Sequence, residues 1–429
     1  MNPLSISFYG ACREVGRAAV LVEGARNRVL LDYGMKIEPV GQPGLPLPVQ
    51  GSIDGLIITH AHLDHSGASP MLYKHNETQT FITPPSIPLI DLLVQDSIKV
   101  GQLKGVKPLF FKQHLRKLMR NVVPAPYGHE RKAGLWNFSL HDAGHIMGSS
   151  WINLMAGETT IAYTGDIKLE KTRLHAGAET PKSRVDVLVT ESTYGDRPHP
   201  PRRELERQFF EACLEKVEDG GIVLVPSFAV GRAQEVASIL IAHGFDHPIR
   251  LDGMSRKAAE IYLQYPDYVR DYGEFSDAMR HCDWVVGPRA RERALEEPGV
   301  IISTAGFLQG GPAVGYALKL RERAGSAIFF VGYQPPDSPA YGLLKLKRFQ
   351  TLDYDLDFSA IDVRHFDFSA HAGREELHQL IKEFRPSLCF VTHGEADQAQ
   401  ALAEWVKKNI GCNAIAPRMG EKFDLKKML

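Results

Sequence analysis

The sequence predicts an α/β protein with more than one domain, and three observations support this. The chain has 429 residues. A single hydrophobic core rarely organises a chain of this length. Its apolar fraction of 44% and charged fraction of 24% are typical of a soluble globular protein. Short strands separated by loops fill the first part of the chain, whereas strands and helices alternate from about Asp196 onward. We therefore expect a layered sheet domain combined with a second α/β layer.

Four apolar runs in the first part end in a polar residue. They are "NRVLLDYG", "DGLIITHAH", "TTIAYTGD" and "VDVLVTEST", and they place Asp32, His60, Asp166 and Glu191 at the ends of predicted strands. Loop residues held by a rigid scaffold are where chemistry usually takes place. The pattern predicts a sheet with a functional site along one edge.

The second part alternates helices with buried strands. The segment "RRELERQFFEACLEKVEDGG" reads as an amphipathic helix, and "HPIRLDG", "GVIISTAG" and "SAIFFVGYQ" read as strands between helical stretches. This alternation predicts a largely parallel sheet. After about Lys345 strand-like character returns, followed by helices predicted over 375–384 and 397–408.

Charge and cysteine usage limit the possible partners and compartment. A net charge of −1 gives no overall attraction to nucleic acid or to an anionic membrane. The five scattered cysteines indicate reduced thiols and a cytoplasmic protein. We expect no signal peptide and no membrane span, because the N-terminus lacks the required pattern and no apolar run approaches about 20 residues.

One local patch departs from this neutral balance. No Asp or Glu occurs from Ser97 to His129, and the stretch carries Lys99, Lys104, Lys107, Lys112, Arg116, Lys117 and Arg120. A polyanion would bind such a patch, but a solvated helical face explains it equally simply. Both interpretations stay open at this point.

The segment "IITHAHLDHSG" crowds three histidines and an aspartate into six positions: His60, His62, Asp64 and His65. Ordinary packing does not call for this, since a buried carboxylate without a partner is costly. On a strand that runs into a loop, His60 and His62 point to the same side, and the chain turns just beyond them. Imidazole and carboxylate are zinc ligands. The spacing predicts ligands for two adjacent ions, which need further ligands from His145, Asp166 and His393.

The motifs "THAHLDHSG", "GHIMGSS" and "TGD" resemble those of the metallo-β-lactamase fold. The resemblance implies a four-layer αββα fold and two Zn²⁺ ions per chain. It assigns His60, His62 and His145 to one ion and Asp64, His65 and His393 to the other, with Asp166 bridging them. Asp32 would lie outside the ligand set and anchor the histidine loop.

Later segments resemble the β-CASP branch of this fold, the nucleases that process RNA and DNA. "TESTYG", "PSFAVGRAQE", "STAGFLQGGP", "FVGYQ", "DFSAHAG" and "VTHGE" occur in the order of that branch. The resemblance implies metallo-β-lactamase segments 1–195 and 346–429 around an inserted β-CASP domain, 196–345. These motifs resemble the nuclease of the eukaryotic cleavage and polyadenylation machinery and its archaeal homologues more than they resemble RNase J.

The resemblance also implies a reaction. A hydroxide shared by the two zinc ions would attack the phosphodiester of single-stranded RNA, leaving 5′-phosphate and 3′-hydroxyl ends. Asp64 is expected to support the catalytic metal centre, and His371 to protonate the leaving oxygen while Glu191 accepts its other N–H. Endonuclease and 5′→3′ exonuclease action both remain open, as does a homodimer.

Four positions are candidate RNA contacts: Ser227, Arg232, Gly310 and Ser369. A guanidinium suits phosphate, and a glycine-rich turn can bind an anion with its N–H groups. Arg232 in a helix cap and the glycines in a plain turn are the simpler alternatives. Relatives often carry a Gly-Arg pair after "GYQ", and "GYQPPDSPAYG" lacks it over Asp337–Gly342, so substrate preference is expected to differ.

Other functions were weighed against these motifs. A glyoxalase-type hydrolase would lack the second domain, and a flavodiiron-type oxidoreductase would carry a carboxylate at position 62 and a flavin domain. A DNA-directed β-CASP enzyme typically lacks the third histidine, here His393. A non-catalytic subunit of a nucleic-acid processing complex would have lost ligands. We also expect sequence specificity to come from elsewhere or to be weak, because the chain begins near its first strand and ends soon after the last motif.

Overall fold

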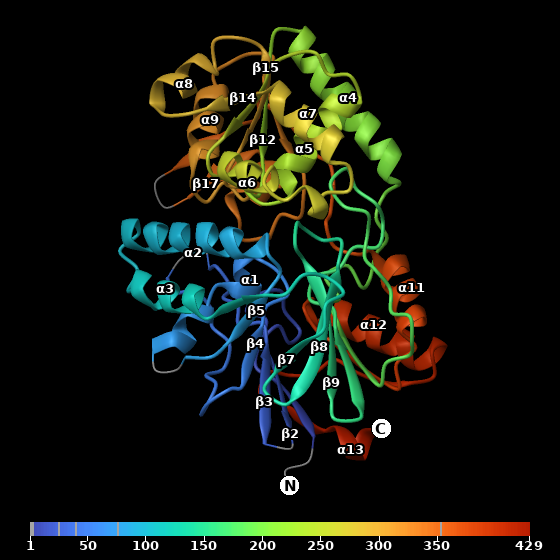
Figure 1. Cartoon of the computed structure of the whole chain (residues 1–429). Helices are drawn as coiled ribbons and strands as arrows, with labels where there is room; N and C mark the ends of the chain where they lie inside the picture. Colours follow the sequence, from blue (N-terminus) through green and yellow to red (C-terminus); the bar gives the residue numbers. More distant parts are fainter. Residues whose placement is uncertain (1–3, 25, 39–40, 75–76, 352–353) are drawn as a thin grey trace. The chain divides into compact units, whose positions relative to one another are not determined.

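The computed structural model describes residues 4–24, 26–38, 41–74, 77–351 and 354–429 (Figure 1). The chain forms two compact units. The first unit comprises the residues up to 171 together with 177–198 and 371–429, and the second comprises 172–176 and 199–370. Each unit has its own sheets and its own buried core, so each is described separately.

Two seven-stranded sheets form the centre of the first unit. One has the order β22-β1-β2-β3-β4-β5-β6, antiparallel up to β3 and parallel from β3 to β6. Its strands are β1 (Ser5–Phe8), β2 (Val20–Gly24), β3 (Asn27–Leu31), β4 (Gly55–Ile57), β5 (Thr80–Ile82), β6 (Val122–Pro124) and β22 (Lys422–Asp424). The parallel strands β3 and β4 bring Asp32 and the histidine loop to the same edge.

The other sheet has the order β21-β20-β11-β10-β9-β8-β7, with β10, β11, β20 and β21 parallel. Its strands are β7 (Arg131–Ala133), β8 (Trp136–Asp142), β9 (Ser150–Ala156), β10 (Thr159–Tyr163), β11 (Val187–Thr190), β20 (Leu388–Val391) and β21 (Asn413–Ile415). Asp166, Glu191 and His393 follow three neighbouring parallel strands of this sheet.

Alternation along the strands explains the layers. In β11, Val187 and Val189 belong to one buried cluster with residues of both sheets, such as Phe8 and Phe138. Leu188, between them, belongs to a second cluster with side chains of α11 and α12. Figure 1 shows α2 and α3 outside one sheet and α11 and α12 outside the other. The predicted four-layer αββα fold is confirmed.

The helical elements of the first unit are mostly short, apart from α2 and the last two long helices. They are α1 (Leu63–Ser66), η1 (Ser69–Lys74), α2 (Ser86–Leu103), α3 (Lys112–Arg120), α11 (Arg374–Phe384), α12 (Ala396–Asn409) and α13 (Leu425–Met428). In the part of the chain that the structure describes, no helix combines the length and apolar character needed to cross a membrane.

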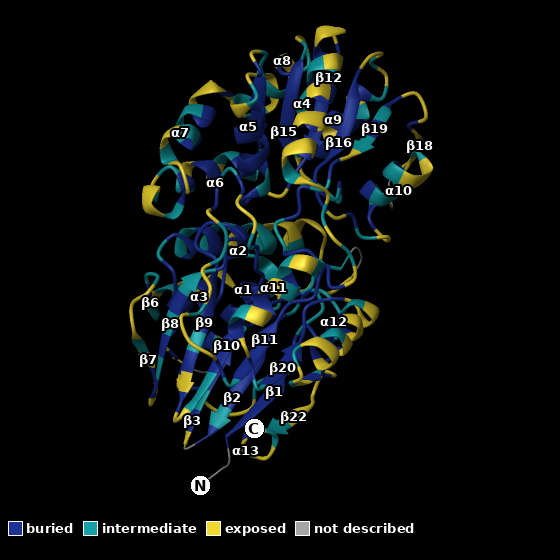
Figure 2. Cartoon of the chain, turned by 90° about the vertical axis from the view of Figure 1, so that its right-hand side faces the viewer, coloured by how far each residue is buried: buried dark blue, intermediate teal, exposed yellow. Residues whose placement is uncertain are grey.

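A six-stranded sheet organises the second unit, with the order β14-β13-β15-β12-β16-β19 and every pair parallel. The strands are β12 (Ile222–Pro226), β13 (Ile249–Asp252), β14 (Cys282–Val285), β15 (Gly299–Ser303), β16 (Ala327–Phe330) and β19 (Asp362–His365), and β17 (Arg348–Gln350) pairs with β18 (Asp355–Asp357). The predicted parallel α/β insertion is confirmed as a fold. Figure 2 shows its strands buried beneath helices with exposed outer faces.

The helices of the second unit follow its strands in turn. They are α4 (Arg202–Glu218), α5 (Arg232–Ala242), α6 (Met254–Tyr262), η2 (Pro266–Tyr268), α7 (Tyr272–His281), α8 (Pro288–Arg293), α9 (Pro312–Leu320) and α10 (Pro339–Leu346). As a packing unit this part of the chain extends to residue 370, because β19 pairs with β16. The domain limit at residue 345 stays a prediction.

Candidate metal centre

The histidine loop connects β4 to α1. His60 lies just past the strand, His62 occupies the N-cap of α1, and Asp64 and His65 lie in its single turn. The backbone of this turn is tightly held, since the N–H of Ala18 donates to the Asp64 carbonyl at 2.7 Å. A Cβ at Gly34 would lie 1.6 Å from that same carbonyl oxygen. Only glycine fits there, so the neighbouring loop fixes the position of the motif.

Asp32 organises this loop from beneath. It is fully buried, and one carboxylate oxygen accepts the Thr59 N–H at 2.7 Å. The other accepts the Thr59 hydroxyl at 2.8 Å, the Tyr163 hydroxyl at 3.0 Å and His65 Nδ1 at 2.7 Å. Because Nδ1 of His65 donates to Asp32, its Nε2 is the atom directed to the cluster. Such an outer partner fixes both tautomer and ring orientation.

Eight side chains converge around Asp166. Three groups have ligand atoms that all lie within 4.8 Å of one another: His60, His62, His145 and Asp166; Asp64, His65, Asp166 and His393; and Asp166, Glu191, His371 and His393. Asp166 belongs to all three groups. The first two groups have the composition of the two ligand sets that the sequence predicts.

The donor atoms fit a metal centre on chemical grounds. Within the described residues, Nε2 of His60 and of His65 and Oδ1 of Asp166 are buried without a well-formed hydrogen bond, although His65 Nε2 lies 3.2 Å from Asp166 Oδ1. Leaving such groups unpaired is costly, unless a cation takes the place of the missing partners. Imidazole nitrogen and carboxylate oxygen are the donors that zinc takes. The residues present therefore suit the group that the sequence predicts.

Protonation in the metal-free protein follows the positions of the carboxylates. Burial lowers the pKa of both His60 and His62, which favours the neutral imidazole that binds metal. Burial opposes charge on His65 as well, but the Asp166 and Asp32 carboxylates outweigh it and raise the pKa of His65 well above its ordinary value. Burial alone would raise the pKa of Asp166, yet the surrounding histidines, His393 first, hold it well below its usual range.

Glu191 and His371 form the remaining part of the cluster. Nδ1 of His371 lies 3.1 and 3.0 Å from the two carboxylate oxygens of Glu191, and it must be the donor because a carboxylate only accepts. Glu191 is buried and also accepts the Ile167 N–H at 2.7 Å. Burial alone would lower the pKa of His371, but the Glu191 and Asp166 carboxylates raise it to about 9. This arrangement keeps a proton on a half-buried imidazole at neutral pH.

Comparison with known proteins shows the relationships of the chain. Residues 360–417 match the Zn-dependent metallo-hydrolase RNA specificity domain, and residues 233–343 match the Beta-Casp domain. RNase aCSPSF2 of Saccharolobus solfataricus is 36% identical over 98% of this chain and 85% of its own length. The probable RNase MJ4 of Methanocaldococcus jannaschii is 34% identical, over 98% of this chain and 100% of its own. The chain belongs to the β-CASP ribonuclease family of the metallo-β-lactamase fold.

The chain is also similar to a transcription termination factor and to a protein of known structure. Transcription termination factor FttA of Thermococcus kodakarensis is 33% identical over 99% of this chain and 72% of its own length. A crystal structure of a protein of unknown function from Enterococcus faecalis aligns with a TM-score of 0.61 at 15% identity, over 98% of this chain and 100% of that one. At that identity the structural likeness shows the fold alone. β-CASP membership confirms the predicted family and excludes the glyoxalase-type and flavodiiron-type alternatives.

Sequence reasoning missed a buried ion pair that supports this β-CASP centre. Lys168 Nζ lies 2.7 Å from Glu376 Oε2, and Lys168 is almost wholly buried. Glu376 also accepts the N–H groups of Leu169, Glu170 and Gly373 at 3.1, 2.8 and 2.9 Å. The carboxylate thereby joins the loop after Asp166 to the segment after His371. The sequence contained one signal for the role of this glutamate. Glu376 lies three residues after Gly373, at the position where a glutamate caps the start of a helix, here α11.

The four candidate RNA contacts lie in the second unit, outside the metal cluster. Ser227 is buried and its hydroxyl donates to the Val225 carbonyl at 3.3 Å. Ser369 is also buried, and Arg232 is the first residue of α5. A Cβ at Gly310 would meet nothing within 4 Å, whereas at Gly311 it would lie 2.6 Å from the Thr304 carbonyl oxygen. RNA contact at the four positions stays a prediction.

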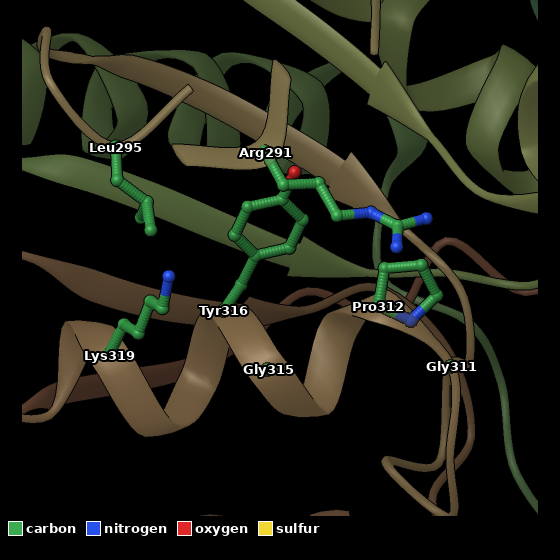
Figure 3. A pocket seen from close by; sticks show the side chains of 7 residues that line it. All are labelled: Arg291, Leu295, Gly311, Pro312, Gly315, Tyr316 and Lys319. Carbon is green, nitrogen blue, oxygen red and sulfur yellow. The ribbon is translucent and has the colours of Figure 1, made fainter. Parts of the chain in front are cut away.

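The second unit also contains a cavity of about 430 Å³ beside α9 (Figure 3). Arg291, which lines it, binds both carboxylate oxygens of Asp252 at 2.7 and 3.2 Å. The Tyr316 hydroxyl donates to the same carboxylate at 3.0 Å. The guanidinium is thus already neutralised by a buried partner, which accounts for it without a ligand.

Proposed function

We propose that this chain is a zinc-dependent ribonuclease that hydrolyses phosphodiester bonds of single-stranded RNA. The observation that carries the proposal is the contact between Glu191 and His371 beside two groups of metal-binding side chains that share Asp166. A proton donor beside a pair of metal sites is the machinery that phosphodiester hydrolysis requires. Relatives named RNase, aligned over 98% of this chain, support the same conclusion.

Two zinc ions would be held by the two groups, His60, His62 and His145 for one and Asp64, His65 and His393 for the other, with Asp166 common to both. When bound, zinc would activate water and neutralise charge on the phosphoryl oxygens. Asp32 keeps His65 in the tautomer that ligation needs, since it accepts the Nδ1 proton. Thr59 and Tyr163 in turn fix the Asp32 carboxylate.

His371 supplies the proton for the leaving group. Its Nδ1 is committed to Glu191, so Nε2 is the atom that can donate to the departing 3′ oxygen. In the metal-free protein the Glu191 and Asp166 carboxylates raise the pKa of His371 to about 9, which favours the protonated ring. The Glu191 carboxylate orients the ring and stabilises its charge, in the manner of an acid paired with an orienting carboxylate. The products would carry 5′-phosphate and 3′-hydroxyl ends.

Endonucleolytic and 5′→3′ exonucleolytic action are both compatible with this machinery, and we propose that the same centre serves whichever mode is used. Candidate substrate contacts at Ser227, Arg232, Gly310 and Ser369, the domain limits 1–195, 196–345 and 346–429, a cytoplasmic location and a homodimer belong to the same proposal. A relative named transcription termination factor suggests nascent transcripts as one class of RNA to test.

A time course on single-stranded RNA with different labels at its two ends tests the proposal. Zinc-loaded protein is compared with Asp64→Ala, and with Asp246→Ala, which removes an exposed carboxylate of the second unit. Fragments that keep either label indicate an endonuclease, and early release of 5′ mononucleotide indicates an exonuclease. Both should vanish in Asp64→Ala and persist in Asp246→Ala. No RNA cleavage by zinc-loaded protein would reject the proposal in favour of a DNA-directed or non-catalytic role.

A further inference from the structure

Helices α2 and α3 carry a surface that the proposed chemistry does not use. We call it the basic arm and define it by its cations: Lys99, Lys104, Lys107, Lys112, Arg116, Lys117 and Arg120. All seven are exposed. No acidic residue occurs between Ser97 and His129, and none of the seven forms an ion pair with any described residue. Figure 1 shows the two helices side by side.

Two other helices of this chain show cations that are neutralised locally. On α4, Arg207 pairs with Glu204 at 2.7 Å and with Glu211 at 2.6 Å. On α6, Arg256 lies 3.2 Å from Glu260. On α3, by contrast, Lys112, Arg116 and Arg120 follow one another at a spacing of four residues, which places like charges next to each other on one face. Such neighbours oppose helix formation, so the arrangement is not explained by the stability of the helix.

The opposite face of α3 holds the cations in a fixed outward orientation. Leu115 and Leu118 are buried, and α3 packs against η1. Nδ1 of the buried His114 accepts the Phe111 N–H at 3.0 Å, which closes the N-terminus of the helix. The charged face is therefore part of an ordered scaffold, and its surface points away from the core.

Helix α2, which carries Lys99 of the basic arm near its far end, begins beside the metal cluster. Thr83 and Ser86, at the beginning of α2, donate to the Gly148 carbonyl at 2.6 and 3.1 Å, in the segment that also carries His145. Helix α2 also packs against α1, which carries Asp64 and His65. Its 18 residues extend about 27 Å at 1.5 Å per residue. The basic arm therefore lies at and beyond the far end of α2, at a distance of several nucleotides from the metal cluster.

Apolar side chains lie among these cations. Phe111 is 55% exposed and Leu103 is 78% exposed. An exposed aromatic ring in a cationic groove or face is what proteins use to stack an unpaired base, while lysines and arginines follow the phosphates. Because the whole chain has a net charge of −1, the remainder of it is net acidic, and attraction of a polyanion concentrates on this arm.

We propose that the basic arm is a docking surface for the phosphate backbone of single-stranded RNA outside the catalytic centre. The proposal rests on the ribonuclease function argued above and deepens it. It makes affinity depend on RNA length, since only a strand that extends beyond the centre reaches the arm. Binding there is independent of sequence and sensitive to salt.

Equilibrium binding tests it, with fluorescent oligouridylates of 6 and 30 nucleotides and zinc-loaded full chain carrying Asp64→Ala to prevent cleavage. Adding Lys112→Gln, Arg116→Gln and Arg120→Gln should weaken binding of the long RNA at least tenfold more than that of the short one. Three lost phosphate contacts should also lower the slope of log affinity against log salt by about 2. Circular dichroism and the melting temperature identify any variant that does not fold.

Two matched variants make the result specific. Lys407→Gln, Lys408→Gln and Lys426→Gln remove exposed cations elsewhere on the first unit and should leave both affinities unchanged. Lys112→Arg with Lys117→Arg keeps the charge and should retain binding of the long RNA. Unchanged long-RNA binding in the arm variant, or equal losses in the arm and control variants, would overturn the proposal. The arm variant could instead lose flotation with anionic vesicles while its affinity for RNA stays unchanged. That result would overturn the proposal and indicate that the arm binds a membrane.

Failure of this proposal is distinguishable from failure of the ribonuclease function. The binding measurement uses a variant that is not expected to cleave, so it does not depend on turnover. Wild-type protein that binds long RNA through the arm but cleaves none would leave the docking surface standing and reject the catalytic assignment. Cleavage without a length-dependent loss in the arm variant would do the reverse.

Discussion

The metal cluster and the basic arm belong to the same unit but treat charge in opposite ways. In the cluster most of the charged and neutral donors are buried, and a buried carboxylate contacts several partners, as Asp32 does with Thr59, Tyr163 and His65. In the arm, cations lie exposed with no described counter-ion. Buried groups at short range act strongly and specifically, whereas exposed charges act weakly, additively and in a salt-dependent way. Substitutions should therefore have large effects on chemistry in the cluster and graded effects on binding in the arm.

Removing the shared carboxylate should have the largest effect. Asp166→Asn keeps the size of the side chain but removes the charge common to all three groups. We expect loss of bound metal, measured by atomic absorption, and a fall in RNA hydrolysis of about three orders of magnitude or more, since metal ions supply several kcal/mol of charge stabilisation. A variant that retains the wild-type metal content would contradict the assignment of Asp166 as a shared ligand.

His371→Asn should reduce kcat by about 10²–10⁴-fold on RNA, because the general acid is lost. Metal content should stay at the wild-type level. A phosphodiester with a 4-nitrophenolate leaving group needs no proton from the enzyme, so its hydrolysis should fall far less. Steady-state kinetics on both substrates checks this. Equal losses on both would mean that His371 does not donate to the leaving oxygen.

Glu376→Ala should act through other residues, since Glu376 joins the loops of Asp166 and His371 without belonging to any metal-binding group. It would also leave Lys168 buried without its partner. We expect a fall in kcat of about 10–100-fold, the usual cost of losing an outer partner of a metal site, with little change in KM and a shifted pH profile.

The matched control is Glu375→Ala, which removes the neighbouring exposed carboxylate paired with Arg374 and should leave kcat unchanged. Glu376→Asp should recover part of the activity. A change in melting temperature with an unaltered pH profile would reduce Glu376 to a purely structural role.

His175 is a buried histidine that belongs to none of the three metal-binding groups, and it can be compared with the histidines of the cluster. Burial lowers the pKa of His175 to about 4, with Arg232 and Arg270 adding to the effect and Glu235 opposing it. The unfolded chain therefore binds one more proton than the folded protein between pH 6.5 and 4. The stability that this histidine contributes is complete above pH 6.5 and falls by about 3 kcal/mol as the pH approaches 4.

His175→Gln should remove that dependence. Denaturant unfolding of the metal-free wild type and variant over this pH range checks the difference in slope. Parallel pH profiles of the two proteins would show that His175 becomes protonated in the folded state with its ordinary pKa.

The sequence was sufficient for the fold and for the members of the cluster, because both depend on local patterns. Asp32, His60, Asp166 and Glu191 each follow an apolar strand, and parallel strands bring their ends together without further information. The partnership of Lys168 with Glu376 was not accessible, since it joins residues 208 positions apart through tertiary contacts that leave no periodic trace. The strand at 362–365 was read correctly as extended, but its partner β16 is set by the sheet and not by its own residues.

The glycine turn at Gly310 and Gly311 is another feature that the sequence alone does not determine, although the two residues are neighbours in the chain. Gly310 and Gly311 look equivalent in "LQGGP", and only the structure shows that Gly311 has a φ of +72° and no room for a side chain. In the basic arm the sequence identified the charges but left their role open. Among the residues that the structure describes, none of these cations has an acidic partner in an ion pair. This property of the folded unit favours the proposed docking surface over a solvated face.

The order of segments in the first unit has a consequence for how the protein is made. β20 lies between β11 and the edge strand β21 of its sheet, and β22 pairs with β1. His371 and His393 arrive with the same late segment, 371–429. During synthesis a ribosome-bound chain that lacks this segment therefore has two unfinished sheets, and it lacks one proposed metal ligand and the proposed proton donor. We expect that such an unfinished copy does not cleave RNA, including the messenger from which it is being translated.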